Sequence, residues 1–487
     1  MRIGCAVALA GLLAVTGCAE PGQNALPPES RSAPPPASPA GGAPAVVEPA
    51  VAAPAPRVVG TAAALPCPTS YAAPDPNRPV LTAAVTVGSR GLVTGTETFV
   101  FRPDLATGEI VLRLWGASPR ARAAGGSVTV SRVAVNGVPR QMSRPAPTLL
   151  RVPLAGKTPA GRPVTIAVDF RLQLPTGASE RFGHRGETAW FGSGLPLLPW
   201  ARGRGWATEP ETANFAEAAT SEAMELASLS VTRPSGLGVL ATGAQVSDDG
   251  STAVFRARSV RDLAVAVGRF RVARATTAHN KEVVVGVAPE VRDDPVVVAR
   301  EMGRAVRAHA SRFGPFPYER LVTAVLPDIR GGIEFPGMVL LGTGQAQGDA
   351  TGSHEVAHEW WYGLVGNNQG RDPWLDEAFG TWAEALDRGT GASYIATTIP
   401  ADGRNRVGAP MTYWEGRSSY YRSVYIQGAV ALLKARSRVG AAAFDSAMTC
   451  HVRRNAHRIT TPADIAASLR HLPAAVTILQ SYGALPR

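Results

Sequence analysis

Two histidines lie four residues apart, and a glutamate directly follows the first. They are His354, Glu355 and His358, in the segment HEVAH. On an α-helix, residues i and i+4 share a face, so both imidazoles can reach one metal ion. The glutamate lies about 100° further around the helix, where it can act as a general base without binding the metal. This spacing predicts a catalytic metal site, and a surface helix with solvent-facing side chains is the alternative.

A carboxylate further along the chain can complete this site. Glu377 lies in WLDEAFGTWAEAL, whose apolar spacing is helical, and GNNQGRDP before it contains turn residues and a proline that can begin a helix. A helix–turn–helix of this length can fold Glu377 back over the first helix. Two histidines and one glutamate leave a fourth position for water, as catalytic zinc requires. The sequence therefore predicts one Zn²⁺ per chain. Glu359 and Glu384 have no required role, and each is expected either beside the ligands or on the surface.

The residues before these motifs are predicted to form strands. Alternating β-branched segments separated by Gly, Pro and Asn-Gly turns are typical of an antiparallel β-domain. We expect this domain to occupy residues 69–275. Its predicted strands are 81–87, 97–103, 109–115, 127–135, 163–174 and 263–273.

The remaining residues, 276–487, are predicted to form a mixed domain. Strands are expected at 282–288, 321–327 and 337–342, and a helix at 295–313, where apolar residues recur at three- and four-residue spacing. From residue 354 onward most segments are helical in pattern. The predicted fold class is α+β multidomain: an N-terminal antiparallel β-domain, then a mostly helical domain with a small sheet.

The metal signature of one known family resembles three features of this chain taken together: the segment HEVAHEWW, the gap from His358 to Glu377, and the segment WLDEAFGTWAE. That family is the aminopeptidase N family of gluzincin zinc metallopeptidases, which includes leukotriene hydrolase. FGPFPYERL at 313–321 is similar to the segment before the substrate strand of that family. The resemblance is strong over about residues 310–435 and implies a β-domain before a thermolysin-like catalytic domain that hydrolyses peptides. About 110 residues follow Glu377, which leaves little room for the large helical C-terminal domain of many members.

The segment GGIEFPGMVLL at 331–341 aligns with the exopeptidase strand of the family. The resemblance implies that Glu334 binds the free α-amine of a peptide. Gly331 and Gly332 let a substrate backbone approach closely. The commonest family form has Met and Asn around the glutamate, whereas this chain has Ile333 and Phe335.

The segment SSYYRSVYIQGAVALL at 418–433 is similar to the Tyr-x-Lys-Gly segment of the family. The resemblance implies that Tyr425 donates a hydrogen bond to the oxyanion formed in the transition state. Tyr420 and Tyr421 are the other candidates, and a buried core tyrosine is the structural alternative. Gln427 replaces the usual lysine.

Other readings remain open, both for the function of the whole protein and for the role of Glu334. The chain can be an endopeptidase or another zinc hydrolase on the same scaffold. It can also be a catalytically silent lipoprotein that binds peptides. At the level of the site, Glu334 can simply pair with an arginine such as Arg330 instead of binding an amine.

The N-terminus has the features of an export signal. One basic residue precedes an apolar stretch that is too short to span a bilayer. The segment VTGC at 15–18 resembles the lipobox of bacterial lipoproteins, which implies a signal peptide at 1–17 and lipidation of Cys18. Ordinary secretion is the alternative, and both readings place the protein outside the cytoplasm. Residues 18–68, rich in Pro and Ala, are predicted to form a semi-rigid tether.

Two cysteines remain outside the signal peptide and the lipidation site, Cys67 and Cys450. In an oxidising compartment either a disulfide or two free thiols fits this pair. The formal net charge is +11, but no run of five to eight Lys or Arg residues occurs. We therefore expect no nucleic-acid partner. The expected partners are a peptide substrate and, through the lipid, a membrane.

Overall fold

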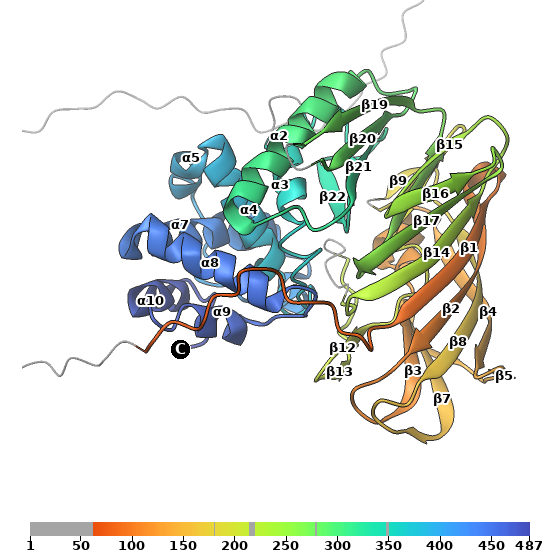
Figure 1. The fold of residues 1–487 in the computed structure, drawn as a ribbon, viewed down its shortest axis with the longest axis horizontal. Coiled ribbons are helices and arrows are strands. Elements are labelled where there is room, and N and C mark those ends of the chain that lie inside the picture. The colour runs from red at the N-terminus through yellow and green to blue at the C-terminus, as the bar shows by residue number, and fades with distance from the viewer. Residues whose placement is uncertain (1–61, 180, 214–219, 278–279, 347–349) are drawn as a thin grey trace, which may run out of the picture. The chain divides into compact units, whose positions relative to one another are not determined.

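The computed structural model describes residues 62–179, 181–213, 220–277, 280–346 and 350–487. The predicted signal peptide, Cys18 and most of the predicted tether lie outside these residues. Residues 60–487 form one compact unit. Within it a five-stranded sheet lies between a layer of β-sheets and a group of helices (Figure 1). The boundary expected near residue 275 stays a prediction.

The largest sheet has eight strands in the order β16-β17-β14-β1-β2-β8-β4-β5. Buried and exposed residues alternate along β1, as the two-residue period of a strand requires. β1 and β14 run parallel, so the expectation of a purely antiparallel domain is wrong for this pair. A long connection separates them in sequence, and such a crossover permits parallel pairing. The strands are β1 (Val80–Val87), β2 (Leu92–Phe101), β4 (Ser127–Val135), β5 (Val138–Pro139), β8 (Val164–Gln173), β14 (Met224–Thr232), β16 (Ala244–Asp248) and β17 (Thr252–Val260).

Smaller sheets share an apolar core with this large sheet. Phe99 of β2, Leu112 of β3 and Phe191 of β11 are all buried in that core. The sheet orders are β3-β7-β6, β10-β11-β18-β15 and β12-β13. The strands are β3 (Thr107–Arg113), β6 (Ser143–Ala146), β7 (Leu149–Thr158), β9 (Gly177–Ser179), β10 (Phe182–Arg185), β11 (Thr188–Gly192), β12 (Trp200–Ala201), β13 (Gly205–Trp206), β15 (Gly238–Ala241) and β18 (Ala264–Gly268).

The five-stranded sheet has the order β19-β20-β21-β23-β22, which places β22 at its edge. The strands are β19 (Arg271–Thr276), β20 (Glu282–Val287), β21 (Arg320–Val325), β22 (Gly332–Phe335) and β23 (Met338–Leu341). The single strand predicted at 263–273 is wrong, because β18 and β19 belong to different sheets. β18 is buried along its whole length and β19 contains no buried residue, but the apolar residues continue through both segments, so the sequence pattern did not reveal the break between them.

The helix predicted at 295–313 is confirmed as α2 (Pro295–Phe313). Asp294 caps it by accepting a hydrogen bond from the Val296 amide at 2.8 Å. Pro295 occupies the first turn, where its missing N–H costs nothing. Gly314 follows with φ +104°.

Most of the chain after residue 350 is helical, as predicted. None of the helices in the described ranges is long and apolar enough to cross a membrane. The helices are α1 (Pro119–Ala123), α3 (Thr351–Ala357), α4 (Trp374–Arg388), α5 (Gly391–Ile395), α6 (Met411–Trp414), α7 (Gln427–Val439), α8 (Ala441–Asn455), α9 (Pro462–Ser468) and α10 (Pro473–Ser481), with 3₁₀ turns η1 (Ser89–Gly91) and η2 (Trp115–Ala117) and a π-helical turn η3 (Arg422–Ile426).

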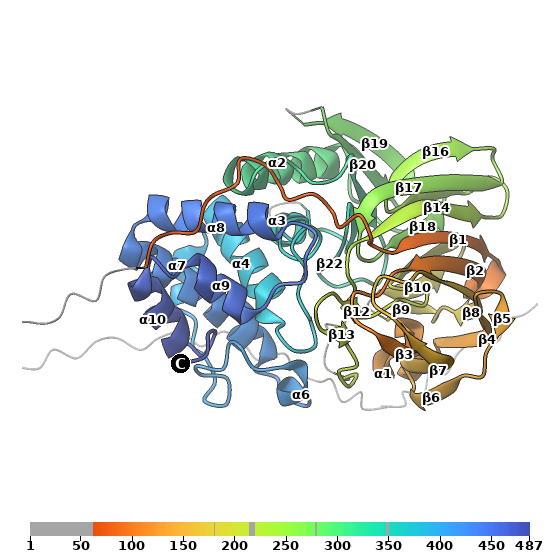
Figure 2. The same ribbon diagram turned by 60° about the horizontal axis from the view of Figure 1, so that its bottom comes forward.

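The segment before β1 runs along α8 rather than standing apart from the fold (Figure 2). A disulfide joins Cys67 in this segment to Cys450 of α8, with a Cα–Cα distance of 4.9 Å. The Ala72 amide donates to the Arg453 carbonyl of the same helix at 2.8 Å. The disulfide therefore fixes the segment before β1 covalently to helix α8, which lies near the other end of the chain.

Candidate metal centre and substrate cavity

Helices α3 and α4 bring the predicted metal ligands together. α3 carries His354 and ends at Ala357, so His358 is its C-cap residue and keeps a helical backbone (φ −63°, ψ −15°). Glu377 lies in the first turn of α4. A Cβ atom at Gly380 of α4 would lie 3.0–3.1 Å from the Cε1 atoms of both histidines. The glycine therefore allows α4 to lie close against the imidazoles.

Three ligand atoms converge at this place. The two Nε2 atoms of His354 and His358 are 3.0 Å apart. The Glu377 Oε2 atom lies 3.2 Å from the first and 3.4 Å from the second. Adjacent ligands of a tetrahedral Zn²⁺ with bonds of about 2.0–2.1 Å are separated by about 3.3 Å. The donor set and its spacing therefore fit a catalytic zinc ion.

The opposite nitrogen of each imidazole has its own partner. The His358 Nδ1 atom donates to the Trp361 carbonyl at 3.0 Å. The His354 Nδ1 atom lies 3.5 Å from Glu384 Oε2, and the Tyr394 hydroxyl donates to the other oxygen of Glu384. Such contacts set the tautomer and orientation of metal-binding histidines.

Of the two positions expected for Glu384, beside the ligands or on the surface, the structure gives the first. Glu384 is 5% exposed and lines the cavity described below. A signal for it existed in the sequence, because Glu384 follows Glu377 by seven residues, or two helical turns on one face. By contrast Glu359 points into the core, where it accepts a hydrogen bond from the Gly337 amide at 2.8 Å.

Two further carboxylates lie beside the ligand atoms. Glu355 and Glu334 each have an oxygen within 4.8 Å of a His358 nitrogen and of each other. Burial raises the pKa of Glu355 to about 7, against the opposing effect of the two histidines. Glu334 accepts a hydrogen bond from Gln369 Nε2 at 3.3 Å. In the described residues, no ion pair joins Glu334 to Arg330.

The edge strand β22 carries Glu334 and forms one wall of the site. A Cβ atom at Gly332 would lie only 2.4 Å from the Cγ atom of Glu355. This position therefore requires glycine if Glu355 is to keep its place. Gly331 adopts φ +83°, a left-handed conformation that favours glycine.

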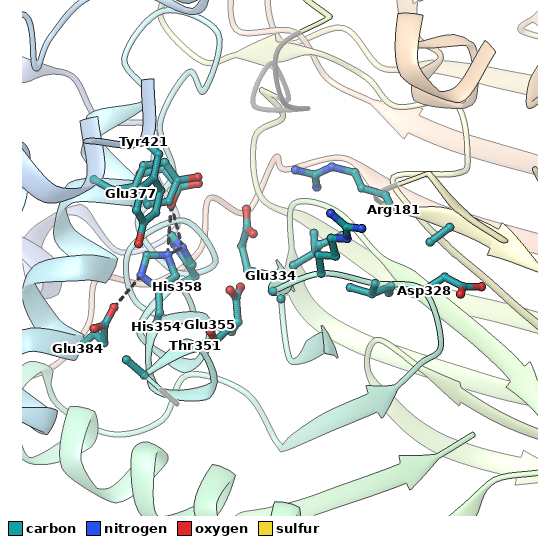
Figure 3. Close-up of a pocket in the computed structure, with 18 of the residues that line it drawn as sticks. Arg181, Asp328, Glu334, Thr351, His354, Glu355, His358, Glu377, Glu384 and Tyr421 are labelled. Carbon is teal, nitrogen blue, oxygen red and sulfur yellow. Dashed lines mark hydrogen bonds and ion pairs between the residues drawn. The ribbon is translucent and has the colours of Figure 1, made fainter. Parts of the chain in front are cut away.

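These groups share a cavity of about 650 Å³ (Figure 3). It extends from the metal ligands past Glu334 to a wall that contains Arg181 and Asp328. Residues of the β-sheet layer, the five-stranded sheet and the helices all contribute to its lining. The cavity therefore lies where these layers meet.

The structure separates the three candidate tyrosines. Tyr425, in η3, lines the cavity, and its ring is stacked 5.8 Å from the ring of His354. Tyr421 also lines the cavity and is 51% exposed. Tyr420 is fully buried among core residues. Gln427 does not face the ligands, since its side chain bonds the backbone of residues 403 and 405 at 2.9 Å each.

No protein-family model matches this chain. Several solved structures resemble it in fold. An M1 zinc metallopeptidase from Deinococcus radiodurans superposes with a TM-score of 0.63 and 19% identity, over 83% of this chain and 92% of that one. A mutant M1 zinc metallopeptidase from Deinococcus radiodurans bound to Tyr-Ser-Ala superposes with a TM-score of 0.64 and 19% identity, over 84% of this chain and 94% of that one. A two-domain M1 zinc metallopeptidase mutant bound to L-tryptophan superposes with a TM-score of 0.63 and 18% identity, over 84% of this chain and 94% of that one. This chain has the fold of these proteins.

Proposed function

We propose that this protein is a zinc-dependent aminopeptidase that acts outside the cytoplasm. The observation that carries the proposal is the convergence of three zinc-type ligand atoms within 3.0–3.4 Å, with Glu355 and Glu334 in the same cavity. Support comes from the structures of similar fold, which are described as zinc metallopeptidases bound to a tripeptide or to single amino acids.

His354, His358 and Glu377 would hold the zinc ion. When bound, zinc polarises a carbonyl group and lowers the pKa of water towards neutrality. The Nδ1 contacts to Glu384 and Trp361 keep both imidazoles in the orientation that directs Nε2 to the ion.

The remaining residues bind the peptide and move protons. The Glu334 carboxylate receives the ammonium group of the first residue and so sets where cleavage occurs. Glu355 accepts a proton from the attacking water and returns it to the leaving nitrogen. The Tyr425 hydroxyl donates to the developing oxyanion.

The proposed location rests on the N-terminal sequence. Lipidation of Cys18 after removal of residues 1–17 would anchor the protein to a bacterial membrane through a tether. The disulfide between Cys67 and Cys450 supports an oxidising compartment. A Cys18→Ser variant is expected in the soluble rather than the membrane fraction, and its retention in the membrane fraction would contradict the anchor.

The activity is tested with fluorogenic aminoacyl amides that carry either a free or an acetylated amine, each with and without a zinc chelator. We expect cleavage of the free-amine substrates alone, and its loss on chelation. The Glu334→Gln variant, with zinc content measured in parallel, should lose this preference for a free amine.

Two other results would replace the proposal. Equal cleavage of blocked and free substrates would indicate an endopeptidase or another zinc hydrolase and remove the role of Glu334. No cleavage by the zinc-loaded protein would indicate a hydrolase of another substrate class or a peptide-binding lipoprotein.

A further inference from the structure

A fully buried glutamine lies beside the carboxylate that is proposed to bind the amine. Gln369 belongs to the connection between α3 and α4 and has no exposed surface. Its Nε2 atom lies 3.3 Å from Glu334 Oε1 and 3.0 Å from Asp376 Oδ2. An amide nitrogen carries two hydrogens, so it can donate one to each carboxylate. One side chain therefore bridges the edge strand β22 and the first turn of α4.

The two carboxylates determine which end of the Gln369 amide faces them. If the amide were turned over, its oxygen would face two carboxylate oxygens, and no hydrogen would lie between any of them. Among the described residues, the Gln369 oxygen has no hydrogen-bond partner of its own. The place of this side chain is therefore set by its nitrogen, through the two bonds to Glu334 and Asp376.

The backbone on both sides of Gln369 is held by hydrogen bonds. The Gly366 amide donates to the Arg458 carbonyl at 2.8 Å, and the Gly370 carbonyl accepts from the Met411 amide at 2.9 Å. A side chain on a backbone fixed in this way can hold a neighbouring functional group in one position. Gln369 therefore has the properties of a residue that positions another.

Without this partner, repulsion would displace the Glu334 carboxylate. Glu334 shares the cavity with Glu355 and Glu377, and one oxygen of Glu355 lies within 4.8 Å of an oxygen of Glu334. Negative charges at this distance repel each other strongly in a buried site. The strand β22 is also at the edge of its sheet and pairs with β23 on one side. The hydrogen bond from Gln369 opposes the repulsion at Oε1 and leaves the second oxygen of Glu334 for an ammonium group.

We propose that Gln369 is the positioning residue of the amine-binding site: it fixes the Glu334 carboxylate where the free α-ammonium group of a peptide must bind. The inference rests on the proposed aminopeptidase function and identifies the residue on which its preference for a free amine depends. Gln369 is not among the residues that line the cavity, so it acts through Glu334 and not by contact with the peptide.

The substitution that tests this role is Gln369→Met, which keeps the length of the side chain and removes the hydrogen-bond donor. For a free-amine aminoacyl amide we expect KM to rise by about 10- to 100-fold, because a binding group displaced by about 1 Å loses its contact with the substrate. The kcat should change by no more than a few-fold, and zinc content should remain one per chain. A loss of zinc, or a fall in kcat with unchanged KM, would show that Gln369 supports the metal site instead.

A double-mutant cycle shows whether Gln369 acts through Glu334. In the Glu334→Gln background, Gln369→Met should change kcat/KM by less than about two-fold, because no carboxylate remains to be positioned. Independent effects of the two substitutions would overturn the inference. Asn367→Ala is the matched control, since Asn367 is a buried amide of the same connection that donates to the Asp372 carbonyl at 3.1 Å. It should leave KM unchanged, and a rise equal to that of Gln369→Met would assign the effect to the connection as a whole.

A binding measurement separates this inference from the activity. Isothermal titration of the zinc-loaded protein compares L-leucinol, which has a free amine and no scissile bond, with its N-acetyl derivative. The free amine is expected to bind at least about 10-fold more tightly, and Gln369→Met should remove most of this difference. A preference kept in full by Gln369→Met would overturn the inference and leave the aminopeptidase intact. If no amide is cleaved, the proposed function fails, and the titration still decides whether Gln369 positions Glu334. Wild-type protein that binds both ligands equally, or neither, lacks the amine site, which overturns the inference.

Discussion

At the scale of single residues, the metal site depends on which atom each side chain presents. The motif identifies His354 and His358, but the partners of their Nδ1 atoms leave the two Nε2 atoms facing each other and Glu377. Glu384 is not one of the three proposed ligands. It contributes to the site by fixing the orientation of the His354 ring. The Tyr394 hydroxyl in turn orients Glu384.

We predict that Glu384→Ala lowers zinc affinity by about 10- to 100-fold, because His354 loses the partner that orients its ring. Competition with a chromogenic chelator measures the affinity. Glu301→Ala, on α2, removes a partly exposed carboxylate that pairs with Arg304 and Arg388, and it should leave zinc affinity unchanged. Equal affinities for wild type and Glu384→Ala would refute the orienting role.

Replacement of Glu355 tests the general base. Glu355→Gln should lower kcat by about 100- to 10,000-fold, because the amide cannot accept the proton. Zinc content should stay at one per chain, as determined by metal analysis. Glu359→Gln is the matched control: Glu359 is buried, does not line the cavity, and accepts a hydrogen bond from the Gly337 amide that the oxygen of a Gln side chain can also accept. Activity of Glu355→Gln close to that of wild type would exclude Glu355 as the base.

At the scale of elements, the edge strand β22 sets the geometry of the cavity. It is bonded to β23 on one side and carries Glu334 beside the ligands. The free side of an edge strand is the natural place for an extended peptide to bind. The closeness of β22 to α3 depends on the glycine at 332.

We predict that Gly332→Ala lowers kcat/KM by about 10-fold or more, since even a displacement of about 1 Å at a catalytic group is costly. The new Cβ atom must displace the side chain of Glu355. Gly303→Ala on α2 is the control, because its Cβ atom would meet nothing closer than 3.6 Å. Thermal unfolding of each variant checks that the fold is intact. Full activity of Gly332→Ala would show that this strand tolerates displacement.

At the scale of the whole molecule, the N-terminal segment joins the helices to the β-sheets. Tyr71 in this segment donates to the Pro315 carbonyl at 2.6 Å and accepts from Trp360 Nε1 at 3.0 Å. Trp360 follows His358 by two residues, so the segment also packs behind the metal site. The disulfide closes this arrangement across a separation of 383 residues.

Loss of the disulfide is predicted to destabilise the protein by about 2–5 kcal/mol, because the unfolded chain regains the freedom of a very long loop. Urea unfolding of wild type and of the double variant Cys67→Ser/Cys450→Ser measures this difference. A reductant should shift the wild-type midpoint towards that of the double variant and leave the double variant unchanged. A reductant effect of equal size on both proteins would mean that the bond does not stabilise the fold.

Several features followed from the sequence because their physics is local. The i, i+4 spacing of the histidines, the apolar spacing of α2 and the alternation within single strands depend on neighbouring residues alone. The apolar spacing sufficed to predict the helix at 295–313, and the histidine spacing sufficed to predict His354 and His358 as ligands. Glu377 was predicted from a second helical segment after a turn, together with the family resemblance. Local patterns also sufficed to predict a strand region followed by a helical region.

Only the tertiary structure decided the contacts between distant segments. The parallel pairing of β1 with β14 and the break between β18 and β19 depend on which strands meet, and alternation alone does not specify partners. Glu384 became a partner of His354 only through the packing of α4 on α3. Arg181 reached the wall beside Glu334 from the β-sheet layer. Such positions depend on packing among segments far apart in sequence, which no local pattern records.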